Sequence, residues 1–151
     1  MHQYSFSRAL AAALALAAMA LCPAAQARPE APAKQPRIQW ELLAKASASA
    51  RHGVRTVNYP APLAQQNGKW VTITGFMVPL EAKFLQSRYL LTPKLSDCES
   101  CIEGGPSGYI EVRGTPLHYR PEPLTLSGRL TLLQDDPSGM YYRLTEARLA
   151  Q

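Results

Sequence analysis

The chain has 151 residues, of which 46% are hydrophobic and 18% are charged, and its formal net charge is +5. This length suits one domain, and the composition excludes both a wholly disordered chain and a protein with many membrane spans. The modest positive charge favours adsorption to anionic surfaces and does not by itself indicate a nucleic-acid partner.

The first segment, residues 1–27, has the pattern of a secretory signal peptide. Arg8 provides a positive start, and residues 9–21 form an unbroken apolar run. That run is shorter than the roughly 20 residues that a membrane-spanning helix needs. The small residues on either side of Gln26 form a cleavage site, so we expect cleavage after Ala27 and export to the periplasm. We therefore expect no transmembrane span in the mature chain and no nucleic-acid partner.

A proline-rich linker and a helix follow the signal segment. Residues 28–37 contain three prolines, which is typical of an extended linker. From Ile38 to Ala50 the apolar residues recur at helical spacing, and Gly53 ends this pattern. The sequence therefore predicts that residues 38–64 consist of an N-terminal helix and an extended segment.

The rest of the chain, residues 65–151, has β character. Runs of β-branched and aromatic residues or of alternating leucines predict five strands, at residues 69–78, 88–92, 108–113, 124–133 and 140–149. The polar residues 134–139 predict a hairpin loop between the last two strands.

Two of these predicted strands carry a glycine at the same offset, Gly75 in one and Gly128 in the other. Glycine weakens the interior of a strand, so such a position marks a bulge or a sharp bend. Small barrels need bends of this kind in their long strands. The sequence therefore predicts a mostly β fold, a small five-stranded OB-like barrel with an N-terminal helix, and the alternative is an antiparallel sandwich.

Residues 68–81, with the sequence GKWVTITGFMVPLE, resemble the first strand of an uncharacterised family of small exported bacterial proteins, a domain of unknown function. Shorter segments resemble its later elements: YLLTP at residues 89–93, the Cys98 segment with YIEV at residues 109–112, LSG at residues 126–128 and YRLT at residues 142–145. The resemblance implies a periplasmic, mostly β protein, sometimes encoded near metal-transport systems. It brings no established activity and no catalytic residues.

The residues that indicate specific chemistry are Cys98 and Cys101, which are the only cysteines after the expected cleavage site. In the oxidising periplasm they can close a local disulfide, which stabilises little because the ring is short. Cys-x-x-Cys is also half of a tetrahedral thiolate site, so zinc or copper are candidate cofactors. The candidates to complete that metal site are His118, His52, Met77 or the cysteine pair of a second subunit.

A third interpretation is that the cysteine pair acts as a thiol–disulfide oxidoreductase, which needs a thiol of lowered pKa. Asp97, Glu99 and Glu103 surround the pair, and no lysine or arginine lies between Lys94 and Arg113. Negative charge nearby raises the pKa of a thiol. The acidic neighbours therefore disfavour redox catalysis and favour a bound cation.

The sequence contains no P-loop, no dinucleotide-binding fingerprint and no His-Glu-x-x-His motif. We therefore expect an exported, non-catalytic binding or accessory protein that contacts a metal ion, a small ligand or a component of a transport system. The alternatives are a periplasmic thiol–disulfide protein that uses Cys98 and Cys101, and a structural partner protein in which the same cysteines form a local disulfide.

Overall fold

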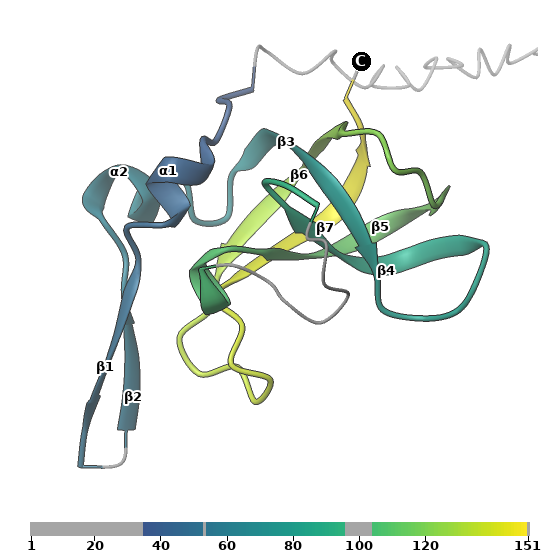
Figure 1. The fold of residues 1–151 in the computed structure, drawn as a ribbon. Helices are drawn as coiled ribbons and strands as arrows, with labels where there is room; N and C mark the ends of the chain where they lie inside the picture. Colours follow the sequence, from purple (N-terminus) through teal and green to yellow (C-terminus); the bar gives the residue numbers. More distant parts are fainter. Residues whose placement is uncertain (1–34, 53, 96–103, 151) are drawn as a thin grey trace, which may run out of the picture. The chain divides into compact units, whose positions relative to one another are not determined.

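The structure is a computed structural model that describes residues 35–52, 54–95 and 104–150. Its elements in chain order are α1 (Trp40–Leu43), β1 (Ser47–Arg51), β2 (Val54–Asn58), α2 (Ala61–Ala64), β3 (Trp70–Pro79), β4 (Leu85–Thr92), a 3-10 turn (Gly105–Ser107), β5 (Ile110–His118), β6 (Leu124–Leu132) and β7 (Tyr142–Leu149) (Figure 1). Among the described residues, no helix has the length and apolar character needed to cross a bilayer.

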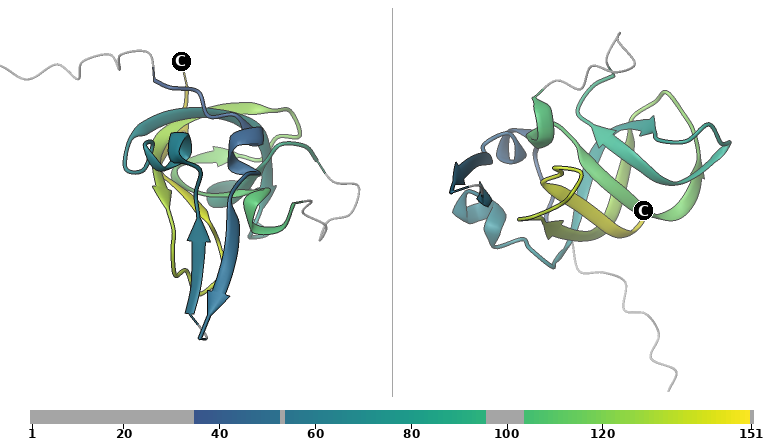
Figure 2. Two further views of the ribbon diagram at one scale, coloured as in Figure 1. Left: turned by 90° about the vertical axis from the view of Figure 1, so that its left-hand side faces the viewer. Right: turned by 90° about the horizontal axis from the view of Figure 1, so that it is seen from below.

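Five strands close into a barrel in the order β3-β4-β5-β7-β6. All neighbours are antiparallel except β5 and β7, which are parallel. Figure 2 shows these strands winding around a common interior. The predicted OB-like barrel and its five strands are thus confirmed, with bounds that differ by a few residues, and the sandwich alternative is wrong.

Gly75 marks the position at which β3 changes its partner. Residues 70–75 of β3 pair with β6, whereas residues 76–79 pair with β4. A Cβ atom at Gly75 would lie 2.6 Å from the carbonyl oxygen of Thr92. Gly128 lies where the register between β6 and β7 shifts, and a Cβ there would lie 2.7 Å from Cγ of Leu144. Both glycines therefore allow the close approach that a bent, closed sheet requires.

The hydrophobic core fills the barrel. Alternate residues of β3 are buried, as expected for a strand with one face on the core. The largest fully buried side chains include Tyr89, Tyr142, Ile73, Met77, Leu91, Ile110, Leu126, Leu130 and Leu144. The hydroxyl of Tyr142 donates a hydrogen bond of 2.7 Å to the carbonyl oxygen of Leu43, which attaches α1 to the barrel.

The helix predicted from Ile38 to Ala50 is wrong for most of its length. α1 has a single turn, and β1 begins at Ser47 and pairs with β2. All five residues of β1 are exposed, so a helix through this Ser/Ala-rich segment would have had no apolar face to bury there. Short helices gain most of their stability from such packing, and this segment pairs with β2 in a hairpin instead.

The end of the predicted linker lies along β3. The backbone N–H of Thr72 donates to the carbonyl of Pro36 at 2.9 Å, and the N–H of Ile38 donates to the carbonyl of Thr72 at 2.8 Å. Nε1 of Trp40 donates to the carbonyl of Thr74 at 2.7 Å. Residues 36–40 are therefore fixed to the barrel, and the predicted signal segment and most of the predicted linker lie outside the described residues.

Candidate functional site

The residues predicted for a metal site are only partly within the described ranges. Cys98 and Cys101 lie outside them, so the disulfide, metal and redox interpretations stay predictions. His118 is the exposed last residue of β5, opposite Leu85 of β4. From the sequence, the strand was predicted to end at residue 113, which left His118 in the connection to the next strand. In the structure, β5 continues for five more residues and includes His118.

His118 lines a pocket of about 430 Å³ where β3 and β5 end, together with Pro79, Glu81, Ala82, Lys83, Phe84 and Tyr119. In the part of the chain that the structure describes, no three side chains of the His, Cys, Asp and Glu types gather closely enough to hold a metal ion. Glu81 is the carboxylate in the pocket lining, and it forms an ion pair of 2.6 Å with Lys83.

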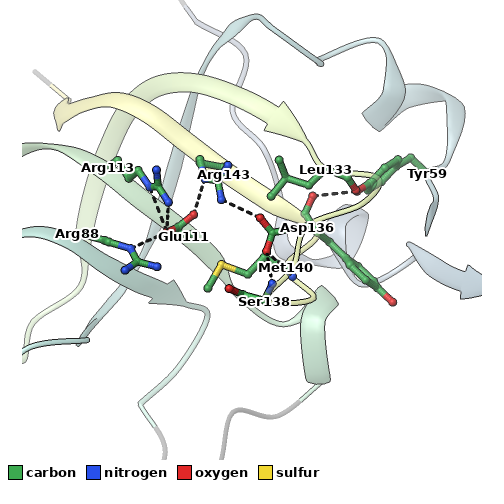
Figure 3. A network of polar contacts seen from close by, with 10 residues as sticks. Tyr59, Arg88, Glu111, Arg113, Leu133, Asp136, Ser138, Met140 and Arg143 are labelled. Atoms are coloured by element: carbon green, nitrogen blue, oxygen red, sulfur yellow. Dashed lines mark hydrogen bonds and ion pairs between the residues drawn. The ribbon is translucent and has the colours of Figure 1, made fainter. Parts of the chain in front are cut away.

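A different group of residues, which we call the arginine face, forms the most concentrated polar site of the described chain. It consists of Arg88 on β4, Glu111 and Arg113 on β5, Arg143 on β7, and Asp136 in the loop between β6 and β7 (Figure 3). Glu111 lies between Ile110 and Val112, two residues of the hydrophobic core. Because strand residues alternate between faces, Glu111 must point to the outside of the barrel.

Although it points outward, the side chain of Glu111 has no exposed surface, because guanidinium groups cover it. Nε of Arg88 donates to Oε1 of Glu111 at 2.7 Å. Nε and Nη2 of Arg113 donate to the same oxygen at 3.1 and 2.9 Å. Nε of Arg143 donates to Oε2. Both carboxylate oxygens are therefore held by charge-assisted hydrogen bonds.

The pairing of the strands explains why these side chains meet. Arg143 is the register partner of Glu111 in the parallel pair of β5 and β7. Arg113 follows Glu111 by two residues on β5, so the two side chains share a face. Arg88 is the register partner of Arg113 in the antiparallel pair of β4 and β5. One carboxylate therefore lies between guanidinium groups from three adjacent strands.

Asp136 adds the loop between β6 and β7 to the arginine face. Its Oδ2 accepts a hydrogen bond of 3.0 Å from Nη2 of Arg143. Its Oδ1 accepts the backbone N–H groups of Ser138 at 3.0 Å and Met140 at 3.4 Å, which fold the loop around the carboxylate (Figure 3). Arg143 is therefore held between two carboxylates, those of Glu111 and Asp136.

The ionisation of Glu111 follows from these contacts. Desolvation by burial raises the pKa of its carboxyl group, but the hydrogen bonds from Arg88, Arg143 and Arg113 outweigh it and lower the pKa to about 2. The same contacts raise the pKa of Arg143 above its ordinary value, although burial alone would lower it. Glu111 is therefore ionised at neutral pH, and by formal charge the face consists of three positive and two negative side chains.

The excess positive charge lies at the end of the face formed by Arg88 and Arg113. Their side chains are 47% and 48% exposed, whereas that of Arg143 is 21% exposed. Arg88 binds Glu111 through Nε alone, so its two terminal nitrogens form no hydrogen bond to a described residue. A guanidinium group whose Nε is bound to a carboxylate and whose terminal nitrogens face the solvent can bind a carboxylate or phosphate group of a ligand.

Sequence reasoning missed the arginine face. The signal was present, because Arg88, Glu111, Arg113 and Arg143 all lie in or next to the predicted strands. A glutamate between Ile110 and Val112 occupies an outward position of its strand, and outward charges on neighbouring strands can pair. Which strands are neighbours depends on the barrel order, and the alternation of residues within a strand does not specify that order.

No family model matches the chain, and no curated protein matches it by sequence. The chain is similar in structure to a DUF3299 family protein from Pseudomonas aeruginosa, with 15% sequence identity and a TM-score of 0.49 over 79% of this chain and 98% of that one. That neighbour carries a domain of unknown function. The resemblance of residues 68–81 to a family of exported proteins stays a prediction.

Proposed function

We propose that the chain is an exported, non-catalytic binding protein, and that the arginine face is its binding surface. The supporting observation is that β4, β5 and β7 bring three guanidinium groups to one buried carboxylate, with Arg88 and Arg113 half exposed. Because Glu111 already holds these side chains in place, little side-chain conformational entropy would be lost when a ligand binds to them. The complementary ligand is a small molecule or a partner segment that presents a carboxylate or phosphate group.

The position of the face supports the same proposal. In OB barrels, ligands bind to the face formed by the second and third strands and to the loops beside it. β4 and β5 are the second and third strands of this barrel, and Asp136 belongs to the loop between the fourth and fifth strands. The arginine face thus combines a surface that suits binding with groups that suit an anion.

The protonation states of the face favour binding over acid–base catalysis. A general acid or base is most effective when its pKa lies near the working pH. The carboxyl group of Glu111 has a pKa of about 2, and it is a weak base at neutral pH. The guanidinium groups stay protonated, so they act as fixed hydrogen-bond donors. These groups can hold an anion in place without exchanging protons with it.

The accessory role expected from the sequence is part of this proposal. The signal-like segment 1–27 and the resemblance of residues 68–81 support a place in the periplasm beside a transport component. The Cys-x-x-Cys pair supports a part in the handling of zinc or copper. In this proposal the arginine face binds an acidic group, and the cysteines are a separate feature of the chain.

A side-chain NMR titration tests the proposed binding surface. The purified protein, with its arginines labelled with ¹⁵N, is titrated with inorganic phosphate and with acetate at low ionic strength. We expect saturable changes in the Nε–H signals of Arg88 and Arg113. Arg88→Gln removes one of the two exposed guanidinium groups, and we expect the dissociation constant for the anion to rise at least about tenfold in that variant.

Arg129→Gln is a matched control for this titration. Arg129 is 46% exposed and also forms an ion pair, at 3.3 Å with Glu146, but it lies on β6 outside the arginine face. The proposal requires that this variant bind as the wild type does. If neither anion gives saturable changes, or if both variants weaken binding equally, the arginine face is not the binding surface.

A further inference from the structure

β1 and β2 form a two-stranded sheet that does not belong to the barrel. Arg51 pairs with Val54 at the closed end of this hairpin, and His52, which follows Arg51, has a φ of 51°. In such a hairpin the residues next to the loop exchange backbone hydrogen bonds, and the pattern then alternates along the strands. Ser49 therefore directs its backbone groups toward β2, whereas Ala48 and Ala50 direct their N–H and C=O groups toward the outer edge.

Contacts of β2 confirm this alternation. Val57 is the register partner of Ala48, so its backbone groups also point away from the hairpin. There they bond to the side chain of Gln134: the N–H of Val57 donates to Oε1 at 3.1 Å, and its carbonyl accepts Nε2 at 3.1 Å. Arg55 of β2 lies over the ring of Tyr141, 5.3 Å from the ring centre. The outer edge of β2 is therefore covered by the connection between β6 and β7.

The outer edge of β1 has no comparable cover within the described residues. The outward backbone groups of Ala48 and Ala50 form no hydrogen bond there, and all five side chains of β1 are exposed. Native proteins usually protect such an edge with lysine, proline or a bulge. β1 carries none of these, and Arg51 at its end is the one charged residue in the strand.

We infer that the outer edge of β1 pairs with β1 of a second copy of this chain, antiparallel and centred on Ser49. In this register Ala48 lies opposite the partner's Ala50, and Ala50 lies opposite the partner's Ala48. Each of these two pairs exchanges both N–H···O=C bonds, because these residues direct their backbone groups outward. The product is one four-stranded sheet across a two-fold axis.

Charge and size make the edge complementary to itself. The centred register places Arg51 opposite the partner's Ser47, so no like charges face each other. The side chains of Ser47, Ala48, Ser49 and Ala50 are small and do not obstruct a second strand. A two-stranded hairpin is marginally stable in water, and a four-stranded sheet is more stable. The strands are short and bury a small area, so the dimer is weak and forms at high protein concentration.

Three substitutions at Ser47 test the pairing and its register. Ser47→Glu places a carboxylate opposite the partner's Arg51 at both ends of the interface, and Ser47→Lys places a like charge there. Ser47→Gln has the size of glutamate without its charge and is the control. Sedimentation equilibrium at low ionic strength measures the dimer dissociation constant. Relative to Ser47→Gln, we expect Ser47→Glu to strengthen the dimer roughly 2- to 30-fold and Ser47→Lys to weaken it similarly.

Amide hydrogen exchange provides a direct readout of the edge. We expect the amides of Ala48 and Ala50 to exchange more slowly as the protein concentration rises, while the amide of Val57 does not change. Ala50→Pro removes one outward donor and should abolish association. A wild-type protein that stays monomeric at millimolar concentration overturns the inference. The inference is also overturned if Ser47→Glu and Ser47→Lys change the dissociation constant equally, or if the Ala50→Pro variant still dimerises.

Discussion

Arg88 of β4 and Arg113 of β5 lie directly opposite each other in their antiparallel ladder, and Oε1 of Glu111 accepts hydrogen bonds from both. Like charges in opposed positions normally destabilise a sheet. The shared carboxylate converts this repulsion into two attractive contacts, and it also orients the two guanidinium groups. The stability of this surface and its proposed affinity for anions therefore depend on the same glutamate.

The stability of the protein should be sensitive to the charge of Glu111. Glu111→Gln keeps the size of the side chain but leaves Arg88 and Arg113 opposed without an anion between them. We expect the free energy of unfolding in urea at pH 7 to fall by about 2–4 kcal/mol. Glu146→Gln, which removes the exposed partner of Arg129, should cost less than about 1 kcal/mol. Similar small losses in both variants would contradict a structural role for the network.

The same carboxylate predicts how stability depends on pH. The pKa of Glu111 in the folded protein is about 2, below its ordinary value of 4.5. The unfolded chain therefore binds a proton at higher pH than the folded chain does, and folding is stabilised by ionised Glu111 above pH 4.5. We expect this contribution to be lost as the pH falls from about 4.5 to about 2. Denaturation curves across this range should show a steeper loss in the wild type than in Glu111→Gln.

The parts of the fold that sequence reasoning predicted are those set by local patterns. Alternating apolar residues and runs of β-branched residues indicated all five barrel strands. The glycines at equivalent positions of two strands, Gly75 and Gly128, indicated the bends. The helix to Ala50 was wrong because alanine favours helices locally, whereas this segment has no apolar surface to bury. The hairpin of β1 and β2 replaced it, and its turn at His52 lacks the Asn-Gly signal that usually marks such loops.

The arginine face could not be predicted by local reasoning because it depends on contacts between strands that are distant in the sequence. Glu111 and Arg143 are 32 positions apart and meet only because β5 and β7 are parallel neighbours. The sequence does show that each residue occupies a strand. It does not show that β7 lies between β5 and β6, and that order determines which charges meet.

Cys98 and Cys101 can be tested independently of the arginine face. Because acidic neighbours disfavour a reactive thiolate, we expect no turnover in a disulfide-reduction assay. If the pair holds zinc or copper, the reduced protein should bind one ion, and Cys98→Ser should abolish that binding. His118→Ala should weaken it only if His118 is a ligand. A disulfide that neither metal displaces would remove the metal interpretation, and turnover lost in Cys98→Ser would establish the redox interpretation.

The parallel contact between β5 and β7 should tolerate no side chain at Gly114. A Cβ atom there would lie 2.1 Å from the carbonyl oxygen and 2.5 Å from the backbone nitrogen of Ala147, and these backbone atoms cannot move aside. We therefore expect Gly114→Ala to lower the free energy of unfolding by about 3 kcal/mol or more. In Gly105→Ala the new Cβ meets no atom within 4 Å, and only the positive φ of 57° opposes it, at about 1–2 kcal/mol.

Gly114→Ala should also alter the arginine face, because Gly114 and Ala147 belong to the same strand pair that places Arg143 beside Glu111. Any separation of β5 from β7 lengthens the contact between those two side chains. In a folded preparation of this variant we expect the Nε–H signal of Arg143 to shift, while that of Arg129 on β6 stays unchanged. A variant that loses stability without any change at Arg143 would show that the strand contact and the arginine face are independent of each other.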